Sequence, residues 1–417
     1  MANNNDKKVL NVPALRFPEF TEEWKRIKVS DLLDFYSTNS LSWEQLVYES
    51  NEPYNLHYGL IHVGLPTIID LTKDKLPSIK DGNVPKKYEL CKEGDIAFAD
   101  ASEDTNEVAK VVEFYNLDSK KVVCGLHTIH GRNNNEQTAK GFLGYCFSSI
   151  VFHNQIRRIA QGTKIYSINT RNFSEVFVGL PSRSEQQKIA ILLRLIDERI
   201  TTQNKIIEKY ESLIQAIIYR AKMDGIRKGT WRKIDLCKVL QERNEKNVEG
   251  RTICSVSVSQ GVVNQIEYLG RSFAAKQTSH YNIVKYGDIV YTKSPTGNFP
   301  YGIIKRSNIR EDVAVSPLYG VYIPASDSIG VFLHFYFMQP SNAFNYLHPL
   351  IQKGAKNTIN ITNGRFLENS VLLPISKSEA NTIAGILKTI QAKIEIEKNL
   401  LQSYTEEKEY LLRQMFI

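Results

Sequence analysis

The sequence predicts an α+β protein whose two globular domains are related by a pseudo-twofold axis and joined by an antiparallel two-helix coiled coil. Three observations lead to this fold class. Residues 184–222 carry a heptad seam, the seam returns 194 residues later, and five other landmarks recur in the same order. The predicted boundaries are residues 1–183 and 224–375 for the globular domains, and 184–223 and 376–417 for the helices.

The first long helix is predicted from a seam whose residues are spaced alternately by four and three for about four heptads. Its seam residues are Ile189, Leu193, Ile196, Ile200, Gln203, Ile207 and Tyr210, followed by Ile214 and Ile217. The matching residues of the second helix are Ile383, Leu387, Ile390, Ile394, Glu397, Leu401 and Tyr404, followed by Lys408 and Leu411. A lone surface helix seldom keeps such a register, so we expect the two helices to pair.

Two polar residues, Gln203 and Glu397, occupy the same step of the two seams. A polar seam residue can fix the register of a coiled coil at some cost in stability. Alternatively, this step lies too near solvent to need an apolar side chain. The pattern itself favours neither explanation.

The two halves of the chain share five further landmarks. They are Trp24 with Trp231, Gly94-Asp95 with Gly287-Asp288, residues 142–147 with 332–337, Gly162 with Gly354, and Pro181 with Pro374. Each Gly-Asp pair predicts a tight turn into a strand, and each aromatic run predicts a helix. The first copy has extra residues around 37–85, where the copies look unrelated. The halves therefore share a scaffold and differ in loops, which is where recognition specificity usually lies.

Other elements are less clearly marked. Residues 1–23 are expected to form an extended arm, and β-rich runs predict strands at 58–63, 252–258, 301–304 and 318–323.

The connection between the copies determines how the helices must run. A helix of about 39 residues is about 58 Å long. Only the short segment 223–230 leads from its end to the second copy, so the second domain must begin near that end. The second helix can pair with the first only by running back. We therefore expect the C-terminal residues to return to the first domain.

Composition limits the class of protein. With 53 Lys and Arg against 45 Asp and Glu, the formal net charge is +8, which suits a polyanionic partner without requiring one. No apolar run approaches the roughly 18 residues of a membrane span, and the first residues are too polar for a secretory signal. We expect a cytoplasmic protein with no membrane contact. Five cysteines without a C-x-x-C pair predict reduced, mostly buried thiols: Cys91, Cys124, Cys146, Cys237 and Cys254.

The sequence lacks the motifs of an enzyme that acts on DNA. It contains no [ND]-P-P-aromatic motif, no G-x-G turn after a strand and no G-x-x-x-x-G-K-[ST] loop, so we predict no catalytic residues. His127 and His130 are the only close histidine pair, and without cysteines or carboxylates at ligand spacing we predict no metal site. Asp95 and Asp288 are better explained as turn residues than as metal ligands.

Loops should carry any residues that contact DNA, because base reading uses Arg or Lys for guanine and Asn or Gln for adenine. The candidate loops are residues 100–107 and 162–171 in the first copy, and 292–298 and 354–365 in the second. The candidate residues on or beside them are Lys164, Asn169, Arg171, Lys293, Thr296, Asn298, Lys353, Lys356, Asn357 and Arg365. The acidic character of 100–107 argues against close phosphate contact there, although a carboxylate can accept a hydrogen bond from cytosine.

Along its whole length the sequence resembles the specificity (S) subunits of type I restriction-modification systems. The resemblance rests on the PALRFPEF opening at 13–20 with Trp24, on the duplicated Gly-Asp-Ile turns, and on the LPxxSEQQKIA segment at 180–190. It implies two target-recognition domains, each reading one half of a bipartite, asymmetric target in double-stranded DNA. It also implies that the two conserved helices act as spacers that fix the gap between the half-sites.

The same resemblance implies the partners. Two modification (methyltransferase) subunits and further restriction (translocase/nuclease) subunits would join this chain, which directs their adenine methylation and DNA cleavage in host defence. S-adenosylmethionine, ATP and Mg would be bound by those partners and no cofactor by this chain. Two alternatives compete. An autonomous methyltransferase or nuclease is disfavoured by the missing motifs, and a coiled-coil scaffold that binds only protein would show no sequence-specific DNA binding.

Overall fold

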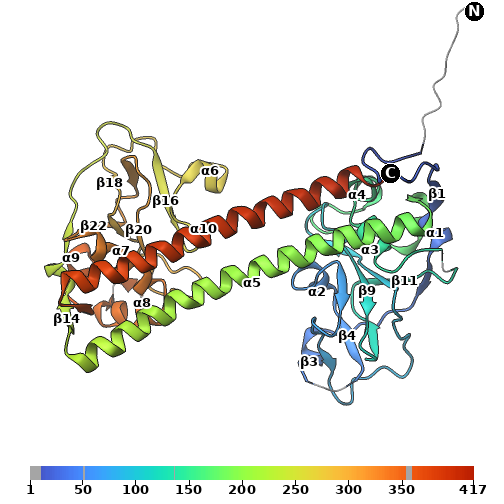
Figure 1. Ribbon diagram of the computed structural model, residues 1–417, viewed down its shortest axis with the longest axis horizontal. Helices are drawn as coiled ribbons and strands as arrows, with labels where there is room; N and C mark the ends of the chain where they lie inside the picture. Colours follow the sequence, from blue (N-terminus) through green and yellow to red (C-terminus); the bar gives the residue numbers. More distant parts are fainter. Residues whose placement is uncertain (1–10, 50–51, 136, 354–358) are drawn as a thin grey trace, which may run out of the picture. The chain divides into compact units, whose positions relative to one another are not determined.

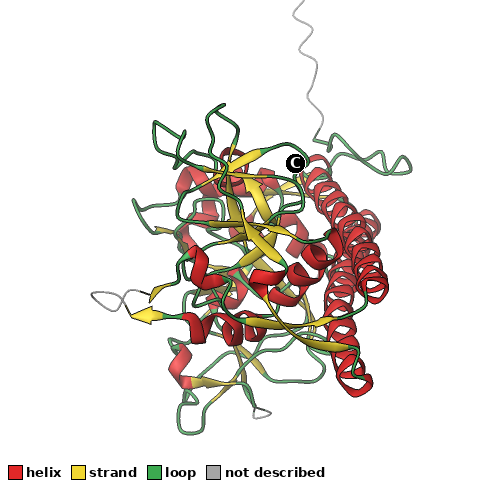
Figure 2. Cartoon of the chain, turned by 90° about the vertical axis from the view of Figure 1, so that its left-hand side faces the viewer, coloured by secondary structure: helices red, strands yellow, loops and turns green. Residues whose placement is uncertain are grey.

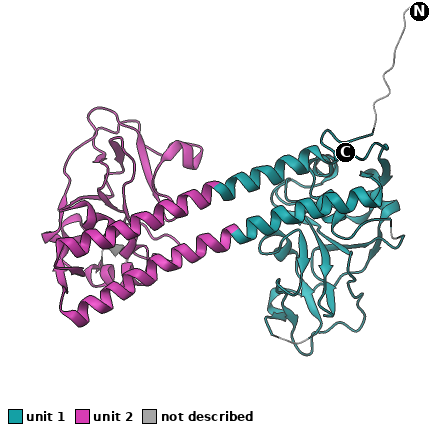
Figure 3. Ribbon diagram, viewed as in Figure 1, with its two compact units in different colours: residues 1–202, 400–417 teal, residues 203–399 magenta. Residues whose placement is uncertain are grey.

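The computed structural model describes residues 11–49, 52–135, 137–353 and 359–417. The chain divides into two compact units (Figure 3): unit 1 consists of residues 1–202 and 400–417, and unit 2 of residues 203–399. Both units combine helices with short strands (Figure 2), which confirms the predicted mixture of the two. Among the residues described, every helix is too short or too polar to span a membrane.

Unit 1 is built around a five-stranded sheet in the order β2-β11-β7-β9-β5 and a four-stranded sheet in the order β10-β4-β6-β3. Figure 1 labels β9 and β11 of the first sheet and β3 and β4 of the second. Its strands are β1 Lys25–Lys28, β2 Asp34–Tyr36, β3 Leu46–Val47, β4 Tyr54–Leu56, β5 Ile68–Asp70, β6 Ser78–Ile79, β7 Ile96–Ala99, β8 Ala101–Ser102, β9 Val111–Asn116, β10 Val122–Cys124, β11 Thr128–Arg132, β12 Tyr166–Ser167 and β13 Phe177–Leu180. Its short helices are α1 Val29–Leu32, α2 Tyr58–His62, α3 Phe142–Phe147 and α4 Ile150–Ile159, with 3-10 turns η1 Trp43–Gln45 and η2 Thr170–Glu175.

The core of unit 1 lies where β7 meets the helices. All four residues of β7 are buried. The ring of Phe98 lies 5.0 Å from that of Phe147 and 4.9 Å from that of Phe173, centroid to centroid. The predicted Gly-Asp turn precedes this strand, with Gly94 at φ 88°, a conformation that favours glycine. The turn thus delivers β7 directly into the core.

The C-terminal residues complete unit 1. Leu411, Met415 and Phe416 are buried in its main core. The ring of Phe416 packs edge-on against Trp24 at 6.4 Å, and the Leu15 N–H donates to the carbonyl of Gln414 over 2.9 Å. The expected return of the C-terminal residues to the first domain is therefore confirmed (Figure 1).

Unit 2 contains two four-stranded sheets, β15-β22-β19-β20 and β17-β16-β21-β18. Its strands are β14 Trp231–Asp235, β15 Leu240–Glu242, β16 Ile253–Ser257, β17 Gly261–Asn264, β18 Asn282–Val284, β19 Ile289–Tyr291, β20 Ile304–Arg306, β21 Val313–Val315, β22 Gly320–Pro324, β23 Gln352–Lys353, β24 Ile359–Asn360 and β25 Ser370–Pro374. Its short helices are α6 Gln265–Leu269, α7 Asp327–Phe337, α8 Pro340–Leu347 and α9 Asn363–Phe366, with 3-10 turns η3 Leu236–Lys238 and η4 His348–Leu350.

The long helices are α5, Arg183–Lys228, and α10, Lys377–Gln414. Helix α5 continues past the expected end at 223, and its Gly225 lies against the ring of Trp231, where a Cβ would stand 1.9 Å from Cδ1 of that ring. The helix ends instead at Lys228, before Gly229, whose φ of 68° is typical of a glycine that follows a helix. Only Gly229 and Thr230 then separate the helix from β14.

Two strand predictions were wrong. Residues 58–62 form helix α2, whose first turn is capped by the His57 side chain accepting from the Gly59 N–H over 3.2 Å. The strand expected at 301–304 begins only at Ile304, since Gly302 has a φ of 97° that breaks the extended conformation. The strands expected at 252–258 and 318–323 are present as β16 and β22.

Candidate nucleic-acid interface

In unit 1 the two candidate loops form one surface. Strand β8, inside the first loop, pairs antiparallel with β12, inside the second, so that Ala101 lies opposite Ser167 and Ser102 opposite Tyr166. The Ile168 N–H donates to the carbonyl of Asp100 over 2.9 Å. Segments about 60 residues apart in the sequence are therefore joined by main-chain hydrogen bonds.

The predicted contact residues of unit 1 lie on this surface and face solvent. Lys164, Asn169 and Arg171 are all exposed. Asn169 precedes the turn η2 and donates its main-chain N–H to Oδ1 of Asn172 over 2.7 Å. Within the described residues, Lys164 and Arg171 make no ion pair, so both cations are available to an anionic partner.

The acidic side chains of the first loop are largely occupied within unit 1. Glu107 is paired with Lys110 over 2.7 Å, and Asp100 lies 3.2 Å from Nδ1 of His127. Asp104 accepts the N–H of Asn106 over 2.8 Å. Glu103 is exposed. The loop is therefore less repulsive to a phosphate backbone than its sequence indicates.

A group of rings that sequence reasoning missed borders the same loop. Trp43 contacts His57, His57 contacts Tyr58, and Tyr58 contacts both His62 and His127, with centroid separations between 4.4 and 6.0 Å. Trp43 is 45% exposed. The group joins the loop where Nε2 of His62 lies 3.0 Å from the Ala101 carbonyl. Burial, followed by the nearby His127, lowers the pKa of His57. Exposed rings of this kind can stack on bases or sugars.

The candidate residues of unit 2 are less uniform. Thr296 and Asn298 are exposed, and the main chain of Thr296 is bonded in both directions to Phe299. Lys293 is half-buried, and burial lowers its pKa. Arg365 is half-buried and paired with Glu368, so it is less available to DNA than predicted. The backbone of Lys353 lies in β23, and Lys356 and Asn357 lie outside the described residues.

Unit 2 also has rings beside its candidate loop. Tyr301 and Phe344 lie 5.2 Å apart, and the Phe344 ring stacks on His348 at 5.2 Å. Phe344 is 39% exposed. The Tyr291 hydroxyl donates to the carbonyl of Tyr301 over 2.8 Å, which connects these rings to the strand that precedes the loop.

The predicted seam residues are mostly withdrawn from solvent. In unit 1, Ile189, Leu193 and Ile196 are buried and Ile200 is half-buried. In unit 2, Gln203, Ile207, Ile214, Ile383, Leu387 and Ile394 are buried, and Tyr210, Ile390 and Glu397 are half-buried. Leu401 and Tyr404, back in unit 1, are half-buried. At the last step of α5 the buried residue is Ile218 rather than Ile217, because a straight helix drifts from a strict heptad.

Ion pairs show the direction of the helices within unit 1. Lys408 pairs with Asp197 over 2.6 Å, and the ring of Tyr404 lies 5.8 Å from the guanidinium of Arg199. Because the residue number falls on one helix as it rises on the other, the two helices run antiparallel there. In unit 2, the amide of Gln203 donates to the Glu397 carbonyl over 3.1 Å and to its carboxylate over 2.5 Å. This partly buried contact supports the register explanation for the polar step.

The two Gly-Asp aspartates act within their turns. Asp95 accepts the Lys92 N–H and Asp288 accepts the Lys285 N–H, both over 2.8 Å. Each is buried and also paired with an arginine: Arg132 in unit 1 and Arg243 in unit 2. Burial opposes ionisation of Asp95, but hydrogen bonds from His130 and Arg132 lower its pKa. These bonds support the turn interpretation.

Comparison with known proteins shows what this fold, and one segment of the sequence, are similar to. Residues 113–212 match the family model described as "Type I restriction modification DNA specificity domain". Over 97% of this chain and 99% of the other, the fold is similar to a type I restriction-modification S subunit from M. genitalium, with a TM-score of 0.58 and 15% identity. No curated protein matches the sequence.

A second solved chain comes from a study of the assembly and conformational transition of the type I restriction-modification system. It has a TM-score of 0.50 and 13% identity, over 93% of this chain and 96% of that one. These findings confirm the resemblance to type I S subunits, with the match to the DNA specificity domain falling on residues 113–212.

Proposed function

We propose that this chain is the non-catalytic specificity subunit of a type I restriction-modification complex and reads a bipartite, asymmetric DNA target. The observation that carries the proposal is the place of the loop 162–171. It lies inside the segment 113–212 that matches the DNA specificity domain, and it is bonded to the loop 100–107. Lys164 and Arg171, which are unpaired among the described residues, therefore lie on the part of the chain that matches the DNA specificity domain.

The duplication supports one reading head in each copy, with domains at 1–183 and 224–375 and spacer helices at 184–223 and 376–417. Both copies close in the same way: β1 pairs with β13, and β14 with β25, just before a long helix. Gln203 and Glu397 are equivalent in the repeat and touch one another. Contact between equivalent residues is what a pseudo-twofold axis through an antiparallel coiled coil produces, so the helices would fix the gap between half-sites.

The partners follow from the same proposal. Two modification subunits and restriction subunits would assemble on this chain, binding S-adenosylmethionine, ATP and Mg and carrying out adenine methylation and cleavage. The start of α5 offers them a docking face, because Ile191 and Leu195 lie one turn apart and are 49% and 48% exposed.

The test is protection of DNA by the purified chain together with its modification subunit. We expect a bipartite, asymmetric footprint whose affinity falls steeply with salt. Replacing both Lys164 and Arg171 by alanine should weaken binding at one half-site and reduce the salt slope by about one for each phosphate that the chain no longer neutralises.

The matched control is Lys73→Ala, which removes an exposed cation outside the candidate loops. It should leave affinity and slope close to those of the unchanged chain. Binding without any sequence preference would refute the proposal and favour the alternative of a protein-binding coiled-coil scaffold.

A further inference from the structure

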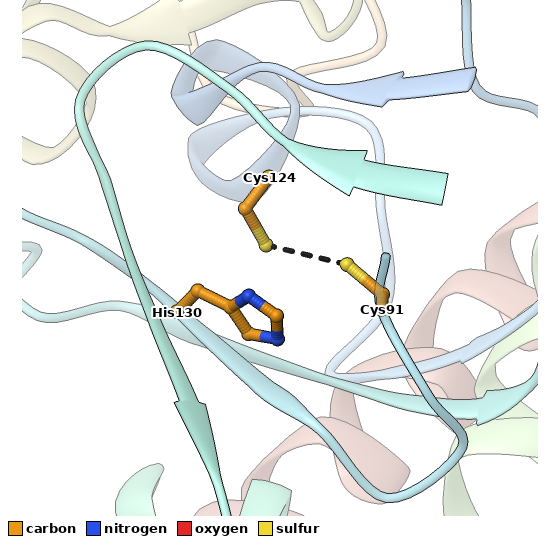
Figure 4. Close-up of side chains that lie close together, drawn as sticks. All are labelled: Cys91, Cys124 and His130. Carbon is orange, nitrogen blue, oxygen red and sulfur yellow. Dashed lines mark hydrogen bonds between the residues drawn. The ribbon is translucent and has the colours of Figure 1, made fainter. Parts of the chain in front are cut away.

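Three side chains from separate segments of unit 1 converge in its interior (Figure 4). Cys91 lies just before the Gly94 turn, Cys124 ends β10 and His130 lies in β11. They are 6%, 2% and 0% exposed. The two sulfurs are 3.5 Å apart, and the two sulfurs and a histidine nitrogen lie within 4.8 Å of one another. Among the described residues, this is the only group of three or more His, Cys, Asp or Glu side chains at such distances.

The histidine is oriented as a metal ligand would be. Its Nε2 lies 2.7 Å from Oδ2 of Asp95, which leaves Nδ1 as the coordinating atom. This Nδ1 is buried and has no hydrogen-bond partner within the described part of the chain. Figure 4 shows one ring nitrogen turned toward the sulfurs. A carboxylate on the far nitrogen of a histidine is the usual support of a zinc ligand, because it fixes the tautomer.

The carboxylate is itself held in place. Asp95 accepts from Nε and Nη2 of Arg132, both over 2.8 Å, and from the Lys92 N–H. A buried imidazole nitrogen without a partner normally costs free energy, since it has lost its hydrogen bond to water. The arrangement therefore fixes the ring while leaving its second nitrogen unsatisfied and facing two thiols.

We propose that Cys91, Cys124 and His130 bind one Zn²⁺ ion. Binding would release one proton from each thiol, and two thiolates with a neutral imidazole would leave a complex of zero net charge, which suits a buried site. Two Zn–S bonds of about 2.3 Å at a tetrahedral angle place their sulfurs about 3.8 Å apart, so the observed separation needs only a small adjustment. The fourth position would fall to water.

The ion would join the two main sheets of unit 1, since β10 belongs to one and β11 to the other. It would also hold both ends of the segment 125–129, which includes His127. The expectation of no metal site rests on spacing along the chain. The ligands here are 33 and 6 residues apart, a pattern that no short motif captures.

The experiment uses the full chain, purified under reducing conditions and loaded with Zn²⁺ alone. After removal of unbound ion, elemental analysis should give one zinc per chain. The variant carrying Cys91→Ala and Cys124→Ala should retain none. The matched control replaces two other buried cysteines, Cys146→Ala and Cys254→Ala, and should still hold one.

Co²⁺ provides an independent readout on the unaltered chain. Bound by thiolates, it should show sulfur-to-cobalt charge-transfer absorption that an equivalent of Zn²⁺ displaces, and this measurement decides the matter if the double variant fails to fold. Zinc absent from the loaded chain, or equal in both double variants, would overturn the proposal. So would a Cys91–Cys124 disulfide, seen as the loss of two hydrogens by mass spectrometry, in a reduced and loaded sample without metal.

Discussion

A single carboxylate fastens each globular fold to the long helix that follows it. The Trp24 indole donates to Glu185 over 3.3 Å, and the Trp231 indole donates to the equivalent Glu379 over 2.7 Å. Both glutamates lie in the first turn of their helix, where a negative charge is favourable. Of the two, only Glu185 has an ion pair among the described residues: Arg16 donates two hydrogen bonds to it, at 2.7 and 2.8 Å.

This difference predicts unequal effects of the same substitution. Glu185→Gln should lower the free energy of unfolding by about 2–3 kcal/mol, because Arg16 loses the charge of its partner in a site where the glutamate side chain is 1% exposed. Glu379→Gln should cost less than about 1 kcal/mol, since an amide oxygen still accepts from Trp231. Urea unfolding of the two variants measures this, and equal losses would contradict it.

Another buried carboxylate makes unit 1 sensitive to pH. Glu113 is 1% exposed and accepts the N–H groups of Gly141 and Gly144 at the start of α3. Burial raises its pKa from an ordinary 4.5 to about 7, against the effect of these hydrogen bonds. In unit 2 the equivalent register position is Arg306, which pairs with Asp327 at the start of α7 over 2.5 Å.

The raised pKa of Glu113 determines the direction in which stability changes with pH. The folded state holds the proton more tightly than the unfolded one, so the contribution to stability is complete below about pH 4.5 and is lost as the pH rises through about 7. Between pH 5 and 8 the free energy of unfolding should fall by about 2.5 kcal/mol on this account. Glu113→Gln should lack this fall, because glutamine does not titrate. Its amide oxygen accepts hydrogen bonds more weakly, but that loss of stability is the same at every pH. If the free energy of unfolding falls equally for the two proteins across this pH range, the prediction is wrong.

Long-range side-chain pairs are what the sequence reveals least. The Gly-Asp turns were predictable from their local pattern. Their arginine partners were not, because Arg132 lies in β11 while Arg243 follows β15, and these positions are not equivalent in the repeat. Pairing of this kind depends on which strands become neighbours. The joining of the loops 100–107 and 162–171, and the convergence of Cys91, Cys124 and His130, escape the sequence for the same reason.

At the scale of elements, long periodic segments were the most predictable. Helices α5 and α10 carry enough heptads for the periodicity to dominate, and their starts agree with the prediction to within one residue. Short elements were less predictable, because a single capping side chain can determine whether a short stretch becomes a helix or a strand. The side chain of His57 turns the alternating stretch that follows it into helix α2.

The spacer helices permit a test of the proposed gap. One full heptad inserted after Gln203, with a matching heptad at Glu397, preserves the seam and adds about 10 Å of helix, equal to about three base pairs of DNA. We expect the gap between half-sites to grow by that amount with both half-sites unchanged. Mapping methylated adenines in cells that express the variant with its modification subunit measures both.

Insertion of a heptad in α5 alone is the matched control. It leaves seven residues unmatched and should lower stability without producing a defined longer gap. A change in the bases of either half-site after the paired insertion would contradict the proposed division between heads and helices.

For the whole molecule, the repeat predicts that the two heads are independent. On the proposed function, exchange of residues 30–176 for the equivalent residues of a type I S subunit should change one half-site and leave the other and the gap unaltered. The exchange must extend to residue 176 because β12 and η2 belong to the same surface as β8. The same methylation map reports the result, and simultaneous change of both half-sites would show that the heads are coupled.

The shared core of unit 1 also sets an order of events during synthesis. Trp24 and Phe142 pack against Phe416, which a ribosome adds almost four hundred residues after Trp24. At roughly 5–20 residues per second, the earlier residues wait for tens of seconds while unit 2 is made. Throughout that interval the apolar surface that later covers Leu411, Met415 and Phe416 is open to chaperones and proteases. The first domain to emerge is thus the last to close, and quality control of the nascent chain acts on it longest.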